Sequence, residues 1–173
     1  MLLGVDAGGE GVPVEGELAG HIITLSSSAG LIGQEFCVAY AASKFGVEGW
    51  MESLRYDVEP YHIHTTVVEP GFFRTELLVD GSTIWPEPTI DDYAERTTAT
   101  VAAWKSMNGQ QTGDPVKLAR ALLTIAGQSK PLQRFVAGTD AIEGVTAKAR
   151  ELLAQAEASR ELGGNLGYDD THA

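Results

Sequence analysis

The chain has 173 residues, of which 43% are apolar and 21% charged, a composition typical of one globular domain with a buried core. Its 24 acidic residues outnumber its 12 basic residues, and the formal charge of -12 disfavours binding to nucleic-acid phosphates or anionic lipids. A single cysteine excludes an internal disulfide, and no apolar stretch is long enough to span a membrane, so we expect a cytoplasmic protein.

Residues 1–20 are rich in glycine and show no sustained period of 2 or 3.6 residues, so we expect a flexible or atypical lead-in. The opening MLLGVDAGGE has no basic region, and its apolar run is too short for a secretory signal. Only three residues precede Gly4, which we judge too few for a first strand.

Three short runs rich in β-branched or apolar residues predict buried strands: HIITLSS at 21–27, IHTTVVEPG at 63–71 and RFVAG at 134–138. Between the first two runs, apolar side chains recur at spacings of three and four, which predicts a helix over 40–58 that ends before Pro60. The residues of this stripe are Val47, Trp50, Met51, Leu54 and Val58.

Residues 72–90 mix bulky apolar side chains with glycine and proline, as in a mobile loop that covers a pocket. We expect three further helices, at 91–107, 114–127 and 140–163, with Asp91, Asp114 and Asp140 at their N-termini. Alternating strands and helices indicate an α/β fold with a parallel sheet and helical crossovers.

Several polar side chains follow the ends of the first two strands. Because ligands bind at the carboxyl edge of an open parallel sheet, Ser26 to Ser28 and the segment from Pro70 to Thr75 are expected at one site. Tyr40 and Lys44 are four residues apart on the connecting helix, so they share a face. A positive charge beside a tyrosine favours its phenolate form, which suits general acid-base chemistry.

The segments GHIITLSSSAG, YAASKFGVEGW and VVEPGFFRT, in this order and spacing, resemble the catalytic half of the short-chain dehydrogenase/reductase family over about residues 20–140. The resemblance implies that Tyr40 exchanges a proton with a substrate carbonyl or alcohol. Ser27, thirteen residues earlier, would orient the substrate oxygen. Lys44 would hold the nicotinamide ribose of NAD or NADP and assist Tyr40.

By the same resemblance, the backbone at Pro70 and Gly71, with Phe72 and Thr75, would lie against the nicotinamide carboxamide. The segment from Phe72 to about Ile90 would be the substrate loop. Phe72 and Trp85 are equally well interpreted as pocket lining and as loop anchors. The family also implies a homo-oligomer that packs through the helix at 40–58.

The glycine-rich turn that binds the pyrophosphate in this family has no good counterpart. Residues 4–11, GVDAGGEG, match only its first spacing, since Glu10 stands where a glycine is needed. We therefore expect a partial Rossmann-like fold without its N-terminal dinucleotide-binding half: a lead-in at 1–20, a catalytic and substrate half at 21–139, and a C-terminal helix and frayed tail at 140–173. Such a chain would leave the strand at 21–27 with an unpaired edge and would be unstable as a monomer.

Two functional hypotheses remain. The first is an NAD(P)-dependent oxidoreductase that transfers hydride between nicotinamide and a small-molecule carbonyl or secondary alcohol, impaired in this shortened chain. The second is a non-catalytic remnant that acts as an interaction or oligomerisation module. No metal site is expected, because His62 and His64 lack a third ligand at suitable spacing.

Overall fold

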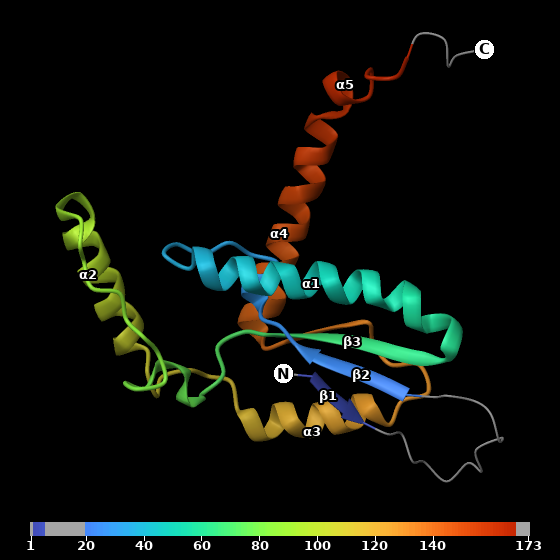
Figure 1. Cartoon of the computed structure of the whole chain (residues 1–173), viewed down its shortest axis with the longest axis horizontal. Coiled ribbons are helices and arrows are strands. Elements are labelled where there is room, and N and C mark those ends of the chain that lie inside the picture. Colours follow the sequence, from blue (N-terminus) through green and yellow to red (C-terminus); the bar gives the residue numbers. More distant parts are fainter. Residues whose placement is uncertain (1, 6–19, 169–173) are drawn as a thin grey trace.

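The computed structural model describes residues 2–5 and 20–168, and it contains a sheet with the strand order β1-β2-β3-β4 (Figure 1). Strands β2, β3 and β4 are parallel, so the α/β class and the partial parallel sheet are confirmed. The strands span Leu2–Val5, Gly20–Leu25, Ile63–Pro70 and Arg134–Ala137.

The edge of β2 is paired with a strand at the start of the chain. The expectations of an unpaired edge on this strand, and of too few residues before Gly4 to form a strand, were therefore wrong. β1 runs antiparallel to β2, with Leu2 opposite Thr24 and Val5 opposite His21. β1 therefore covers the edge of β2 from His21 to Thr24, where backbone N–H and C=O groups would otherwise be exposed. The remainder of the expected lead-in, residues 6–19, lies outside the described residues.

Two crossover helices lie on opposite sides of the sheet, α1 above and α3 below in Figure 1. α1 spans Val38–Val58 and α3 spans Pro115–Ala126, close to the predicted ranges. Asp114 caps α3 as predicted, because its carboxylate accepts a hydrogen bond from the backbone N–H of Val116 at 2.8 Å. The buried apolar core consists of Ile23, Ala29, Ala41, Met51, Val67, Val68, Leu78, Ile125, Ala137 and Ala141.

The inward face of α1 differs from the predicted apolar stripe. Met51 is 2% exposed, as expected for a core residue, but Trp50 is 46% exposed. Glu48 faces inward instead and is 4% exposed. A buried carboxylate is tolerated there because Arg134, on β4, contacts it at 2.5 Å.

Three further helices extend from the sheet: α2 at Asp91–Ser106, α4 at Thr139–Ala158 and α5 at Arg160–Gly163. The predicted N-cap roles of two aspartates are wrong, since Ile90 precedes α2 and Gly138 precedes α4. α4 projects away from the sheet in Figure 1. Much of its apolar stripe is therefore exposed, including Ile142 and Leu153. None of the helices formed by residues 20–168 offers an apolar stretch that would cross a lipid bilayer.

Candidate active site

The segment after β2 forms one wall of the site. Ser26 donates its backbone N–H to the carbonyl of Val68 at 2.8 Å, which extends the alignment of β2 and β3. Ser27 then caps a short 3-10 helix, because its hydroxyl oxygen accepts a hydrogen bond from the N–H of Ala29 at 3.1 Å. The turn therefore holds the Ser27 side chain at the carboxyl end of β2.

Tyr40 and Lys44 lie together on α1, as their spacing predicts. The ammonium nitrogen of Lys44 is 5.7 Å from the centre of the Tyr40 ring. The same nitrogen donates a hydrogen bond to the backbone carbonyl of Leu25 at 3.3 Å. Lys44 thus fixes the helix against the end of β2 and places a positive charge beside the Tyr40 ring.

The chain beyond β3 is held by two hydrogen bonds. The N–H of Gly71 donates to the carbonyl of Ala137 at 2.9 Å, and the N–H of Phe72 donates to the carboxylate of Asp140 at 2.7 Å. A Cβ atom at Gly71 would overlap the Asp140 carboxylate, so a larger residue there would have to displace Asp140 from its hydrogen bond with Phe72. Thr75 accepts a hydrogen bond from the N–H of Leu77 and begins a short 3-10 helix.

One cavity of about 550 Å³ brings these segments together. Ser27 and Tyr40 both line it, and Lys44 lies beside Tyr40 without lining the cavity. The predicted contact residues after β3 line it as well: Pro70, Gly71, Phe72 and Thr75. The sheet edge and one face of α1 therefore meet at a single hollow large enough for a small molecule.

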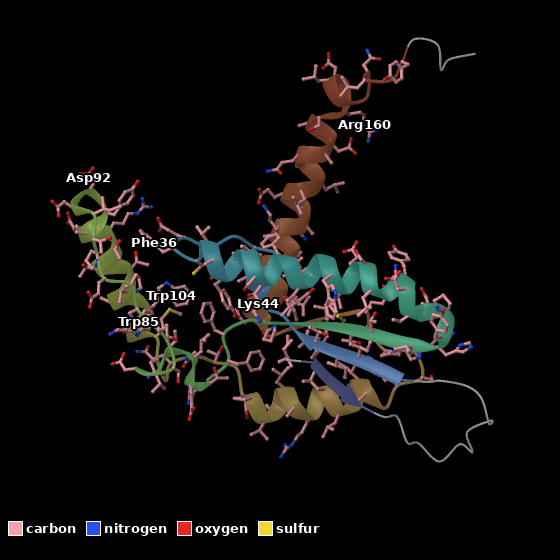
Figure 2. All side chains as sticks on the ribbon, viewed as in Figure 1. Phe36, Lys44, Trp85, Asp92, Trp104 and Arg160 are labelled. Carbon is pink, nitrogen blue, oxygen red and sulfur yellow. The ribbon has the colours of Figure 1, made fainter. Side chains whose placement is uncertain are left out.

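The far wall of the cavity is aromatic. Figure 2 shows Phe36, Trp85 and Trp104 on the same side of the molecule, between the start of α1 and α2. The Phe72 and Trp104 rings lie 5.8 Å apart, and Trp85 donates a hydrogen bond to Asp80 at 3.2 Å. The remaining large apolar side chains of the wall are Phe73, Leu77, Leu78, Ile84, Val101 and Leu118.

Comparisons with known proteins agree with this geometry. The short chain dehydrogenase family model matches residues 13–83. The oxidoreductase BOA17 of Botryotinia fuckeliana is 32% identical over 83% of this chain and 52% of its own length. A short-chain dehydrogenase structure from Streptomyces avermitilis matches 86% of this chain and 53% of its own chain, with 28% identity and a TM-score of 0.72.

The chain belongs to the short-chain dehydrogenase/reductase family. It spans about half the length of the curated relatives it matches. A family member from Burkholderia phymatum, solved in complex with NAD, shares the fold with a TM-score of 0.56 and 16% identity. Another relative is the 3-ketodihydrosphingosine reductase of Bacteroides thetaiotaomicron, 32% identical over 69% of this chain and 44% of its own length.

Of the glycines in residues 4–11, which match the family's phosphate-binding turn only in part, the structure describes only Gly4. This residue lies in β1 and pairs with Ile22 across an antiparallel ladder. The family's phosphate turn follows a parallel strand and begins a helix, so Gly4 is not part of such a turn. Residues 6–11, which hold the other glycines of the segment, lie outside the described residues.

Two parts of this short-chain dehydrogenase site were missed by the sequence reasoning. Asp140 was expected to cap a helix, but its carboxylate instead holds the backbone of Phe72. The sequence predicted the helix α2 but not that its residues Val101 and Trp104 line the cavity. The three-residue spacing of these two apolar side chains was a signal for a buried face, but not for the partner of that face.

Neither Cys37 nor the histidines His62 and His64 add a catalytic or metal-binding group to the site. Cys37 lines the cavity, and burial raises the pKa of its thiol, which disfavours the nucleophilic thiolate. His62 and His64 are exposed, and the His64 ring packs edge-on against His21 with 6.1 Å between centres. Across residues 2–5 and 20–168, no group of three or more His, Cys, Asp or Glu side chains is arranged to hold a metal ion.

Proposed function

We propose that residues 21–139 form the catalytic and substrate half of an NAD(P)-dependent oxidoreductase that acts on a carbonyl or secondary alcohol. The observation that carries this proposal is the shared cavity of Ser27 and Tyr40, with Lys44 beside the Tyr40 ring. In the reducing direction, Tyr40 gives its phenolic proton to the substrate oxygen, and Ser27 donates a hydrogen bond to the same oxygen. The oxidising direction is the reverse.

The residues present fit the nicotinamide end of the proposed cofactor. The backbone at Pro70 and Gly71 lines the cavity, and the buried Ser26 hydroxyl at the same cavity has no hydrogen-bond partner among the described residues. Lys44 would hold the ribose, and Pro70, Gly71, Phe72 and Thr75 would contact the carboxamide. The bound cofactor would supply or accept the hydride. The choice between NAD and NADP stays open.

The substrate we propose is a bulky apolar ketone or its alcohol. The wall formed by Phe72, Trp85 and Trp104 provides apolar surface and few charges, which favours a hydrophobic body next to the reacting carbonyl. The relative named 3-ketodihydrosphingosine reductase has, by that name, a substrate of this kind. A cytoplasmic location stays a prediction.

Titration of the chain with NADH and NADPH tests the proposal. Because Trp85 and Trp104 line the cavity, we expect saturable quenching of tryptophan fluorescence. Lys44→Ala should weaken the apparent affinity by about tenfold or more, the loss of roughly one charged hydrogen bond. The matched control is Lys148→Ala, since Lys148 lies on α4 and pairs with Glu151. Saturation without any difference between the two variants would contradict the assigned role of Lys44.

An interaction module is the second candidate function, favoured by exposed apolar side chains on α1. Phe45, Trp50 and Tyr56 are 45%, 46% and 64% exposed. Large apolar side chains left exposed on a helix mark a contact site in many proteins. The proposed homo-oligomer would use these side chains of α1. β1 already pairs with the edge of β2, so that edge is not proposed as a contact.

We expect the chain to self-associate at micromolar concentration, with Trp50→Gln shifting the equilibrium toward monomer. Size-exclusion chromatography with light scattering measures both states. Tyr61→Gln, at a site beyond the end of α1, is the control for a simple loss of exposed aromatic surface. A monomeric wild-type chain that unfolds in one cooperative urea transition would contradict self-association and the expected instability.

A further inference from the structure

Three elements of the fold meet at one guanidinium group outside the cavity. Arg134, on β4, places Nη1 2.5 Å from the Oε2 of Glu48 on α1 and 2.6 Å from the Oε1 of Glu69 on β3. We call Arg134, Glu48 and Glu69 the Arg134 cluster. The second guanidinium nitrogen contacts Glu52 at 3.0 Å, and the Glu52 side chain is 64% exposed. None of these four residues lines the cavity.

The two carboxylates of the Arg134 cluster are buried, whereas the Arg134 side chain is 37% exposed, and the cluster holds two acidic groups for one basic group. Glu69 is 0% exposed and Glu48 is 4% exposed, so two buried carboxylates share one guanidinium. Burial raises the pKa of Glu69 to about 7, the Arg134 hydrogen bond opposes this rise, and the charge of Glu48 adds to it. The cluster therefore gains or loses a proton close to neutral pH.

The surroundings of the cluster contain few other charges. Arg55 lies near it on α1, at a small cavity shared with Arg134, and forms an ion pair with Glu59 at 3.7 Å. His21 and His64 belong to the other face of the sheet, because His21 contacts Thr66 and side chains alternate along β3. Glu48 and Glu69 each keep one carboxylate oxygen without a hydrogen-bond partner among the described residues.

Glu48 also touches the segment that carries the site serines. A Cβ atom added at Gly30 would lie 2.9 Å from the Oε1 of Glu48 and 2.7 Å from the Oγ of Ser26. A larger residue at position 30 would therefore have to displace the Glu48 carboxylate or the Ser26 hydroxyl, which converge there. Ser26 lines the cavity, so the Arg134 cluster lies directly behind the cavity wall.

Two sequence neighbours connect the cluster with the site. Glu48 stands one helical turn after Lys44 and two turns after Tyr40, on the same face of α1. Glu69 directly precedes Pro70 and Gly71, which line the cavity. Any movement of one carboxylate relative to Arg134 would therefore change the distance between the helix and the strand end.

We propose that the Arg134 cluster is a positioning device that holds the Tyr40 helix in register with the Pro70–Gly71 end of β3. This role rests on the proposed function, because its purpose is to set the proton donor against the cofactor-binding backbone. Loss of this proton as pH rises leaves two buried carboxylate charges on one guanidinium, and their repulsion loosens the register. The cluster thereby makes the geometry of the site depend on pH.

Nuclear magnetic resonance of the chain labelled with 13C at the tyrosine rings tests this role without any enzyme assay. The Tyr40 signal is assigned with Tyr40→Phe. In the wild-type chain we expect it to shift with a midpoint at about pH 7, the pKa of Glu69. Glu69→Gln, which keeps the side-chain volume, should abolish this shift, and the matched control Glu52→Gln should retain it.

A second variant keeps the test decisive if Glu69→Gln does not fold. Glu48→Gln removes the like charge beside Glu69 and should move the midpoint to lower pH. A Tyr40 signal that does not respond to pH, or that titrates alike in the wild type and Glu69→Gln, would overturn the proposal. Loss of cofactor binding with an intact pH response would instead contradict the proposed function alone.

Discussion

Replacing Tyr40 with phenylalanine is expected to lower carbonyl reduction by about 10²- to 10⁴-fold, the usual contribution of a positioned general acid. The change removes one oxygen atom and keeps the ring beside Lys44, so the cavity and the fold should be preserved. The reaction is followed as NADH or NADPH oxidation with a bulky apolar ketone such as 2-decalone. The effect should appear in kcat, since the proton is transferred in the chemical step.

Tyr56→Phe is the matched control for this measurement. Tyr56 lies on the same helix, is 64% exposed and does not line the cavity, so its variant should react at the wild-type rate. Equal rates for Tyr40→Phe and the wild type would remove Tyr40 from the proposed mechanism. A chain that binds NADH but reduces no ketone in either form would favour the interaction module.

The stability of the fold is expected to fall as pH rises from about 4.5 to 7, through the titration of Glu69. Its folded pKa of about 7 lies above its ordinary value of 4.5, so the folded state binds more protons in this range. Stability from this group is complete below pH 4.5 and is lost as pH rises through 7, by up to about 3 kcal/mol. Urea unfolding at a series of pH values measures the slope.

His21 acts in the opposite direction over part of the same range. Burial lowers its pKa below 6.5, so the unfolded state binds more protons and stability rises with pH up to that value. Subtracting the curve of Glu69→Gln from that of the wild type isolates the Glu69 contribution. A difference curve without slope between pH 4.5 and 7 would show that Glu69 is ionised throughout.

The fold class and most element ranges could be predicted from the sequence because they depend on local chemistry. The β-branched run at 21–27 became β2, and the spacing of Tyr40 and Lys44 placed both groups on one face of α1. Asp114 and Pro115 predicted the start of α3 for the same reason, since capping involves residues two or three apart. Such signals require no knowledge of distant parts of the chain.

Errors arose where a side chain could be satisfied by more than one partner. Asp140 has the spacing of a capping box with Glu143, yet its carboxylate binds the N–H of Phe72, 68 residues away in the chain. Trp50 was predicted to lie on the apolar stripe of the helix but is exposed, and Glu48, which is not part of that stripe, is buried against Arg134. The periodicity of apolar residues indicates which face of a helix is the most apolar. It contains no information about an ion pair such as Glu48–Arg134, whose partners are 86 residues apart in the chain.

The sequence by itself determined which groups could be expected at the candidate site: a phenol, an ammonium and a serine hydroxyl at family spacing, on elements whose local patterns specify a helix and a parallel strand. Only the tertiary structure decided what surrounds them, namely the antiparallel partner of β2, the aromatic wall of α2 and the buried Arg134 cluster. These features depend on contacts between segments that are distant in the chain. Whether a charge or an apolar surface is buried there depends on how those segments pack against one another.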